Sequence, residues 1–288
     1  MKRQPIRRAL LLAFTTAPML PRVLRAGEPQ RVVCIGGAVT EIAYALGAGD
    51  RLVGADTTST YPAAATNLPR IGYARQVGAE GVLSLRPSLV LAGHEAGPPA
   101  ALDQIASTGV KLVRLDNDLS FDGVIRRVRV LAQALALPDA GARLERELHA
   151  QWQSTQQNIA AARARHARRP AVVFVLGHSG APLVSGRDTA ANALIELAGG
   201  RNPLAAAFSG YKPLTPEAML GAAPDAILTS DESLTAIGGV PGLLARPGVS
   251  LTPAGRARRV ISMGALQLLG FGPRLPQTVA EIAAQIHA

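Results

Sequence analysis

The chain has 288 residues, of which 48% are hydrophobic and 17% are charged; this composition excludes a disordered chain and suffices for two lobes of ordinary domain size. The formal net charge is +10, but residues 1–26 hold six Lys and Arg and no acidic residue. Without them, 24 basic residues face 20 acidic ones and the charge falls to +4. A basic surface that binds nucleic acid is therefore not expected.

The N-terminus has the pattern of a secretory signal peptide. Lys2, Arg3, Arg7 and Arg8 precede the apolar residues 9–14, and cleavage is expected after Ala26. This pattern predicts export to the periplasm and leaves both the general secretory and the twin-arginine route open. No run of 18 apolar residues follows, so the sequence predicts no membrane span.

Strands and helices alternate in the first half of the mature chain. Apolar runs predict strands at 32–35, 52–55, 89–92 and 111–115, and helical patterns fall at 40–46, 77–85 and 100–108. Thr40 is the expected N-cap of the first helix and Gly47 its stop. This alternation predicts βαβ units around a mainly parallel sheet.

The rhythm changes in the middle of the chain. Two helices are predicted at 121–137 and at about 140–167, and the second is roughly 40 Å long at about 1.5 Å per residue. Strands (171–176, 226–229, 260–262) and helices (189–198, 215–222, 277–286) then alternate again. The expected organisation is a signal peptide (1–26), an N-terminal α/β lobe (30–138), a connecting helix (139–168) and a C-terminal α/β lobe (170–288).

Three segments carry a family resemblance. Residues 36–47 (GGAVTEIAYALG), 68–73 (LPRIGY) and 270–274 (GFGPR) resemble the haem-binding members of the helical-backbone periplasmic binding proteins, a class that includes vitamin B12 and siderophore binders. The resemblance covers residues 30–288. It implies two α/β lobes with mainly parallel sheets that face a cleft and are joined by one long helix. It also implies a monomer that captures ferric haem and delivers it to an inner-membrane ABC permease.

The resemblance supplies a haem site. Tyr73 matches the family's iron ligand, and a phenolate oxygen suits ferric iron, as it does in other tyrosine-ligated haems. Arg75 is the expected partner of the phenolate. His178 follows a predicted strand and is a candidate second axial ligand or ligand of a second haem, so that one or two bound haems both remain open.

The remaining cleft residues are candidates of a more general kind. Arg75, Arg187 and Arg246 are candidate partners of the haem propionates, because a guanidinium recognises carboxylates. Tyr211 and Met263 are the expected cleft wall, and His94, which also follows a strand, is a further candidate for its rim.

Two acidic residues match the positions where this class docks onto its permease. Glu80 and Glu217 each fall early in a predicted helix, within stretches 79–91 and 216–228 that resemble each other. A siderophore or corrinoid is the alternative ligand, for which Tyr73 would not be needed as a metal ligand. No nucleophile elbow, phosphate loop or dinucleotide fingerprint occurs, so no catalytic site is expected.

Overall fold

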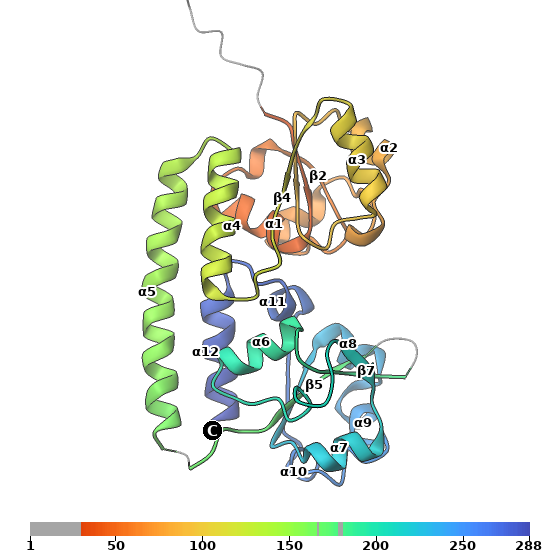
Figure 1. Cartoon of the computed structure of the whole chain (residues 1–288), viewed down its shortest axis with the longest axis vertical. Helices are drawn as coiled ribbons and strands as arrows, with labels where there is room; N and C mark the ends of the chain where they lie inside the picture. The colour runs from red at the N-terminus through yellow and green to blue at the C-terminus, as the bar shows by residue number, and fades with distance from the viewer. Residues whose placement is uncertain (1–29, 166, 178–180) are drawn as a thin grey trace, which may run out of the picture.

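Two α/β lobes lie on the same side of a long helix, one beyond the other along its axis (Figure 1). The computed structural model describes residues 30–165, 167–177 and 181–288. The expected signal peptide and His178 therefore lie outside the described residues. No helix within this described part is both long and apolar enough to cross a membrane.

The N-terminal lobe is built on a four-stranded parallel sheet with the order β2-β1-β3-β4. Its elements are β1 (Val32–Ile35), α1 (Gly37–Ala45), β2 (Leu52–Ala55), α2 (Ala79–Ser84), β3 (Leu89–Ala92), α3 (Pro99–Ser107) and β4 (Lys111–Arg114). The two central strands, β1 and β3, are buried along their whole length. Their continuous apolar runs follow from this position, because a central parallel strand is covered on both faces.

The C-terminal lobe has a five-stranded mixed sheet with the order β7-β6-β5-β8-β9. The parallel strands are β5 (Val172–Leu176), β8 (Ala226–Ser230) and β9 (Val260–Met263), and the antiparallel edge is β6 (Leu183–Ser185) and β7 (Tyr211–Pro213). Its helices are α6 (Ala190–Leu197), α7 (Pro216–Ala222), α8 (Asp231–Ala236), α9 (Gly239–Leu244), α10 (Pro253–Arg256) and α11 (Ala265–Leu269). The sequence did not predict β6 and β7, because strands of three residues are too short for a detectable alternation.

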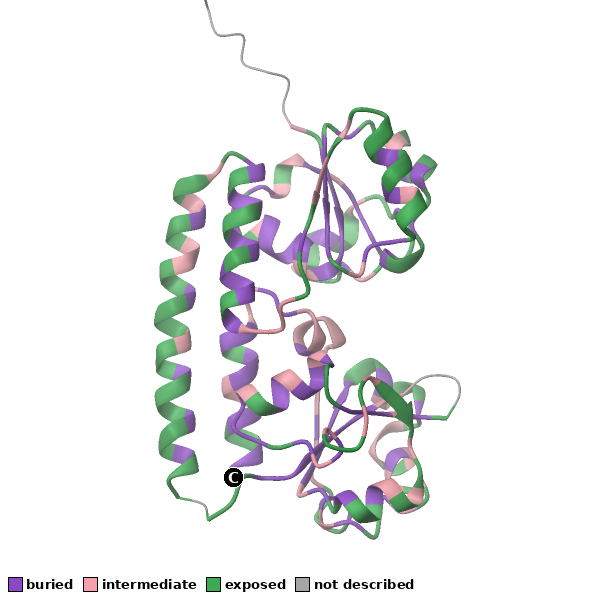
Figure 2. Cartoon of the chain, viewed as in Figure 1, coloured by how far each residue is buried: buried purple, intermediate pink, exposed green. Residues whose placement is uncertain are grey.

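Three helices form the backbone that both lobes share: α4 (Phe121–Ala134), α5 (Pro138–Arg163) and α12 (Leu275–Ile286). The N-terminal half of α5 packs on α4 and its C-terminal half on α12 (Figure 1). Gly141, Leu148, Thr155 and Ala162 form one buried stripe at intervals of seven residues, and Figure 2 shows most of the remaining surface of α5 exposed. With 26 residues, α5 is about 39 Å long.

The expected fold class, two α/β lobes with mainly parallel sheets joined by one long helix, is confirmed. The long helix ends at Arg163, earlier than the expected 167. The first helix begins at Gly37 rather than at Thr40, whose hydroxyl is buried and contacts Ser59 Oγ at 2.7 Å. No side chain caps α1; the amide of its N-cap residue, Gly36, donates instead to the carboxylate of Asp56 at 2.7 Å. No local sequence pattern predicts this contact.

The segment between α11 and α12 reaches from the C-terminal lobe onto the N-terminal lobe. A Cβ atom on Gly37 would lie only 2.5 Å from Leu266 Cδ1, so α11 touches the start of α1. Arg274 donates to both carboxylate oxygens of Glu41, at 3.0 and 2.9 Å, and its guanidinium lies 3.9 Å from the ring centre of Tyr61. Glu41 is only 4% exposed, so this ion pair is a buried link between the lobes.

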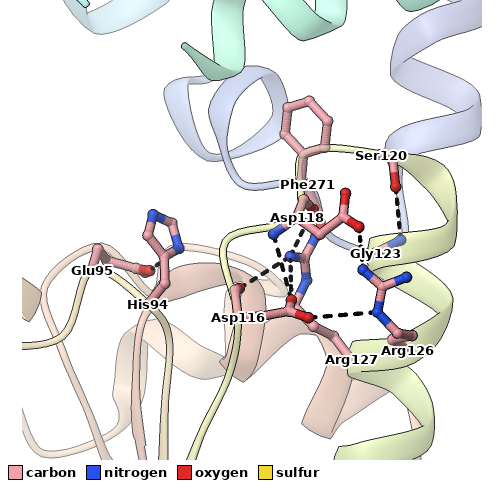
Figure 3. Close-up of polar contacts among 9 residues, drawn as sticks. All are labelled: His94, Glu95, Asp116, Asp118, Ser120, Gly123, Arg126, Arg127 and Phe271. Carbon is pink, nitrogen blue, oxygen red and sulfur yellow. Dashed lines mark hydrogen bonds and ion pairs between the residues drawn. The ribbon is translucent and has the colours of Figure 1, made fainter. Parts of the chain in front are cut away.

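Arg127 of α4 makes a second link at the same place (Figure 3). Its guanidinium donates to the carbonyl oxygen of Phe271 at 3.1 Å and to that of Asp118 at 3.0 Å, and lies 3.7 Å from the Asp116 carboxylate. The side chain is 8% exposed. We call the segment 270–274, held by Glu41 and Arg127, the interlobe clamp.

Removing one partner of the buried ion pair should destabilise the protein strongly. We expect Arg274→Ala to lower the free energy of unfolding by about 3–5 kcal/mol, because the buried Glu41 carboxylate loses its compensating charge. Glu41→Gln should cost less, since it leaves no uncompensated negative charge. Urea denaturation followed by the fluorescence of Trp152 measures both changes.

The matched control is Glu145→Gln, which removes an ion pair with Arg129 on the outer surface of α4 and α5. Such exposed pairs contribute little, so the unfolding midpoint should hardly move. An Arg274→Ala variant as stable as Glu145→Gln would contradict the role of the interlobe clamp.

Candidate functional site

The carboxyl ends of the parallel strands in the two sheets face each other. β1 leads directly into α1 and β9 leads directly into α11, and α11 contacts the first residue of α1 through Leu266 and Gly37. Ligands of α/β folds bind at the carboxyl ends of parallel strands. The loops that follow these strands therefore form the two walls of the candidate site, with α11 at its base.

Tyr73 lies on the wall of the N-terminal lobe, in the segment that follows β2. Gly72 has φ 98°, a backbone conformation that favours glycine, and its carbonyl accepts from Thr57 N at 2.9 Å. Ile71 and Ala74 are buried on either side, at 6% and 1% exposure. Tyr73 itself is 46% exposed, so its neighbours anchor the loop and leave the phenol free to meet a ligand.

The loop of Tyr73 is joined to the loop that follows β3. Gly97 N donates to the carbonyl of Ala74 at 2.9 Å, and Val77 N donates to the carbonyl of Gly97 at 2.8 Å. His94 belongs to this second loop, two residues after β3 ends. Tyr73 and His94 therefore stand on neighbouring, hydrogen-bonded loops of one lobe.

Tyr211 contributes to the opposite wall, from β7 of the C-terminal lobe. Burial raises the pKa of Tyr211, while the positive charge of Arg75 and a hydrogen bond with Thr189 act in the other direction. Arg75 belongs to the N-terminal lobe, two residues after Tyr73, so its charge acts across the space between the lobes. Arg75 therefore lies near enough to Tyr211 for its charge to act on the phenol, and Tyr73 is two residues before Arg75 in the same loop.

Arg187 lies beside Tyr211 on the same wall. Its backbone N donates to the carbonyl of Phe208 at 3.0 Å, and its carbonyl accepts from Gly210 N at 2.9 Å. The guanidinium is 53% exposed and its Nε lies 3.6 Å from the Asp188 carboxylate. Such a weakly held guanidinium on the cleft edge is available to an anionic group of a ligand.

Two of the predicted residues lie apart from this group. Arg246 follows α9, close to Gly248, whose Cα packs on Pro216 at the start of α7; Figure 1 shows α7 and α9 on the part of the lobe remote from the N-terminal lobe. Met263 ends β9 but is only 8% exposed, because it packs into the core. Neither offers the cleft much surface.

Glu80 and Glu217 occupy equivalent positions on the outside of the two lobes. Glu80 is in the first turn of α2, which precedes β3, and Glu217 is in the first turn of α7, which precedes β8. Both side chains are exposed. Each lobe therefore presents one carboxylate from a short helix.

Arg127 was not among the predicted residues, although the sequence contains a signal for it. Arg127 is three residues after Val124 and four before Leu131, so it falls on the apolar face of its helix. A charged residue on a buried face requires a partner. The partners are carbonyl groups of Asp118 and Phe271, and no pattern in the sequence identifies a carbonyl 144 residues away.

Comparisons with known proteins agree with this architecture. A family model described as periplasmic binding protein matches residues 32–266. The structure is similar to that of the periplasmic haem-binding protein BhuT in complex with two haems, with a TM-score of 0.85 and 49% sequence identity over 90% of this chain and 98% of that chain.

Two further relatives extend the comparison. The periplasmic haem-binding protein RhuT from Roseiflexus sp. RS-1, solved in the apo form, is 41% identical with a TM-score of 0.85, over 90% of this chain and 98% of that one. A vitamin B12-binding protein of Yersinia pseudotuberculosis serotype O:1b (strain IP 31758) is 27% identical over 78% of this chain and 77% of its own length.

The electrostatic contact between Arg75 and Tyr211 can be tested by titration. Arg75→Gln removes a positive charge that favours the phenolate, so we expect the pKa of Tyr211 to rise further above its usual value. Ultraviolet absorbance of the phenolate measures this, with Arg75→Gln/Tyr211→Phe to assign the step. Arg146→Gln, on the exposed side of α5, is the control and should leave the titration unchanged. If the pKa of Tyr211 is unchanged in Arg75→Gln, the charge of Arg75 does not act on Tyr211.

Proposed function

The chain belongs to the periplasmic binding protein family, a family of binding proteins rather than enzymes, and we propose that it captures ferric haem in the cleft between its lobes and delivers it to an inner-membrane ABC permease. The observation that carries this proposal is Tyr73, an exposed phenol on an anchored loop at the carboxyl end of a strand. The resemblance to two haem-binding proteins at 49% and 41% identity supports the same ligand.

Tyr73 is suited to hold the iron. Its phenol has an ordinary pKa of about 10, and a ferric ion bound to the oxygen favours the phenolate. Arg75 adds a positive charge on the same loop, and its guanidinium would stabilise the phenolate by a charge-assisted hydrogen bond. We assign Tyr73 as the iron ligand and Arg75 as its partner.

Other predicted residues of the cleft suit the propionates and the porphyrin ring of a haem. We assign Arg75 and Arg187 to the two propionates and keep Arg246, which lies near α7, as the third candidate for that role. Tyr211 supplies an aromatic face of the kind that packs on a porphyrin. Met263 would support the cleft from below rather than line it.

A corrinoid is the second candidate ligand. The vitamin B12-binding relative supports it at 27% identity, and a siderophore remains in the same class of alternatives. Neither uses a tyrosine to bind its metal, so Tyr73 and Arg75 favour haem over both.

Export and docking complete the proposal. Residues 1–26 would direct the chain to the periplasm as a cleaved signal peptide, and the mature monomer would consist of lobes at about 30–138 and 170–288 joined by the long helix. Glu80 and Glu217 would meet arginine side chains on the two permease subunits. One carboxylate on each lobe suits a partner with two similar halves, and charge pairing sets orientation and association rate.

Titration with hemin tests the ligand. The mature protein should show a saturable spectrum of ferric haem with a phenolate-to-iron band, and Tyr73→Phe should lose that band because the ligating oxygen is gone. Tyr61→Phe is a matched control, since Tyr61 is 45% exposed and lies on the interlobe clamp. The corrinoid would be favoured instead if the protein binds cyanocobalamin saturably and leaves the visible spectrum of added hemin unchanged.

Haem uptake by cells or proteoliposomes tests docking. Glu80→Gln and Glu217→Gln should each reduce transport, and the double variant should reduce it most, while hemin affinity stays at the wild-type value because neither residue lies in the cleft. Glu147→Gln, an exposed glutamate on α5, is the control. Normal haem uptake by the Glu80→Gln/Glu217→Gln double variant would contradict the proposed docking role.

A further inference from the structure

His94 and Glu95 form a histidine–carboxylate pair on the wall of the N-terminal lobe. His94 Nδ1 lies 3.1 Å from Glu95 Oε2, and the two side chains are 41% and 23% exposed. The carboxylate lies against two glycines, since a Cβ on Gly36 would be 2.5 Å from Glu95 Oε1 and a Cβ on Gly93 would be 2.5 Å from Glu95 Oε2. The glycines therefore leave a space that the carboxylate fills, which fixes the position of the imidazole.

This contact assigns the proton of the imidazole. Nδ1 donates to Glu95, so that Nε2 carries the lone pair. Partial burial lowers the pKa of His94, and the charges of Arg127 and Arg75 lower it too, against the opposing effects of Glu95 and Asp116. Because Nδ1 faces Glu95, Nε2 is the ring nitrogen that remains to bind a metal ion.

The imidazole stands on a loop that is hydrogen-bonded to the loop of Tyr73. Figure 3 shows its ring projecting from the loop toward the C-terminal lobe, away from the strands of its own lobe. The loops of His94 and Tyr73 are joined through both backbone groups of Gly97. Two side chains on one wall approach a haem from the same face, so they cannot be the two axial ligands of one iron.

We propose that His94 is an alternative iron ligand on the same wall as Tyr73, oriented by Glu95, so that haem exchanges between an oxygen and a nitrogen donor within one lobe. The inference rests on the proposed haem-binding function. Its chemistry is that of metal-binding histidines, which donate their second ring N–H to a carboxylate that fixes the tautomer and raises the basicity of the ligating nitrogen. Exchange within one wall requires no change in the distance between the lobes.

The experiment uses the Tyr73→Phe protein, in which the preferred donor is absent. Hemin should still bind, with the visible and electron paramagnetic resonance spectra of ferric haem ligated by nitrogen. Adding His94→Ala should abolish this nitrogen signature, and adding Glu95→Gln instead should weaken hemin binding about 10- to 100-fold, as expected for loss of an outer partner of a ligand. His94 is a partly exposed loop residue, so these variants should fold, which circular dichroism checks.

The chain offers a matched control. His149 lies 3.7 Å from Glu145 on α5, a histidine–glutamate pair of the same chemistry outside the cleft, and Tyr73→Phe/His149→Ala should behave as Tyr73→Phe. The proposal is overturned if Tyr73→Phe binds no hemin, if Tyr73→Phe/His94→Ala keeps the nitrogen signature, or if His178→Ala removes it instead. Failure of the wild-type protein to bind hemin at all would refute the proposed function itself.

Discussion

The buried ion pair between Glu41 and Arg274 is the contact on which the arrangement of the two lobes depends. Charges taken out of water are tolerated only when their partners satisfy them closely, and here both carboxylate oxygens accept from one guanidinium. Together with the bond from Arg127 to Phe271, this pair holds the segment 270–274 on the N-terminal lobe. It thereby places α11 at the base of the cleft and turns the strand ends of both sheets toward each other.

Hydrogen bonds of the backbone and of buried polar side chains hold the loops of the cleft walls in place. The exposed residues on these loops do not contribute to this. The fully buried carboxylate of Asp56 accepts from Gly36 N, Thr58 N and Ser59 Oγ, and so ties the loop after β1 to the loop after β2. Gly97 ties the loop of Tyr73 to that of His94. Side chains that stand on such loops meet a ligand with little loss of conformational freedom.

The proposed haem site and the proposed docking residues lie on different elements of the same scaffold. The proposed haem site combines a phenol, an imidazole and guanidinium groups, which suit a ferric ion carried by an anionic ring. Glu80 and Glu217 lie exposed in the first turns of the short helices α2 and α7. Because α5 is one continuous helix packed on both α4 and α12, the lobes have a stiff connection, and only limited closure is expected. The distance between the carboxylates of Glu80 and Glu217 should then change little when a ligand binds.

The sequence alone determined the alternation of strands and helices, the two lobes and the long helix, and its resemblance to haem-binding proteins indicated Tyr73 as the candidate iron ligand. These features follow from local periodicity and from short motifs, because both are encoded by residues that are close together in the sequence. The tertiary structure alone decided that the charge of Arg75 acts on Tyr211, that Met263 is buried in the core at the end of β9, and that Asp56 accepts from the amide of Gly36. It also decided the pairing of Glu41 with Arg274, 233 residues apart. Contacts of this kind depend on how the lobes pack, and no local pattern of residues encodes them.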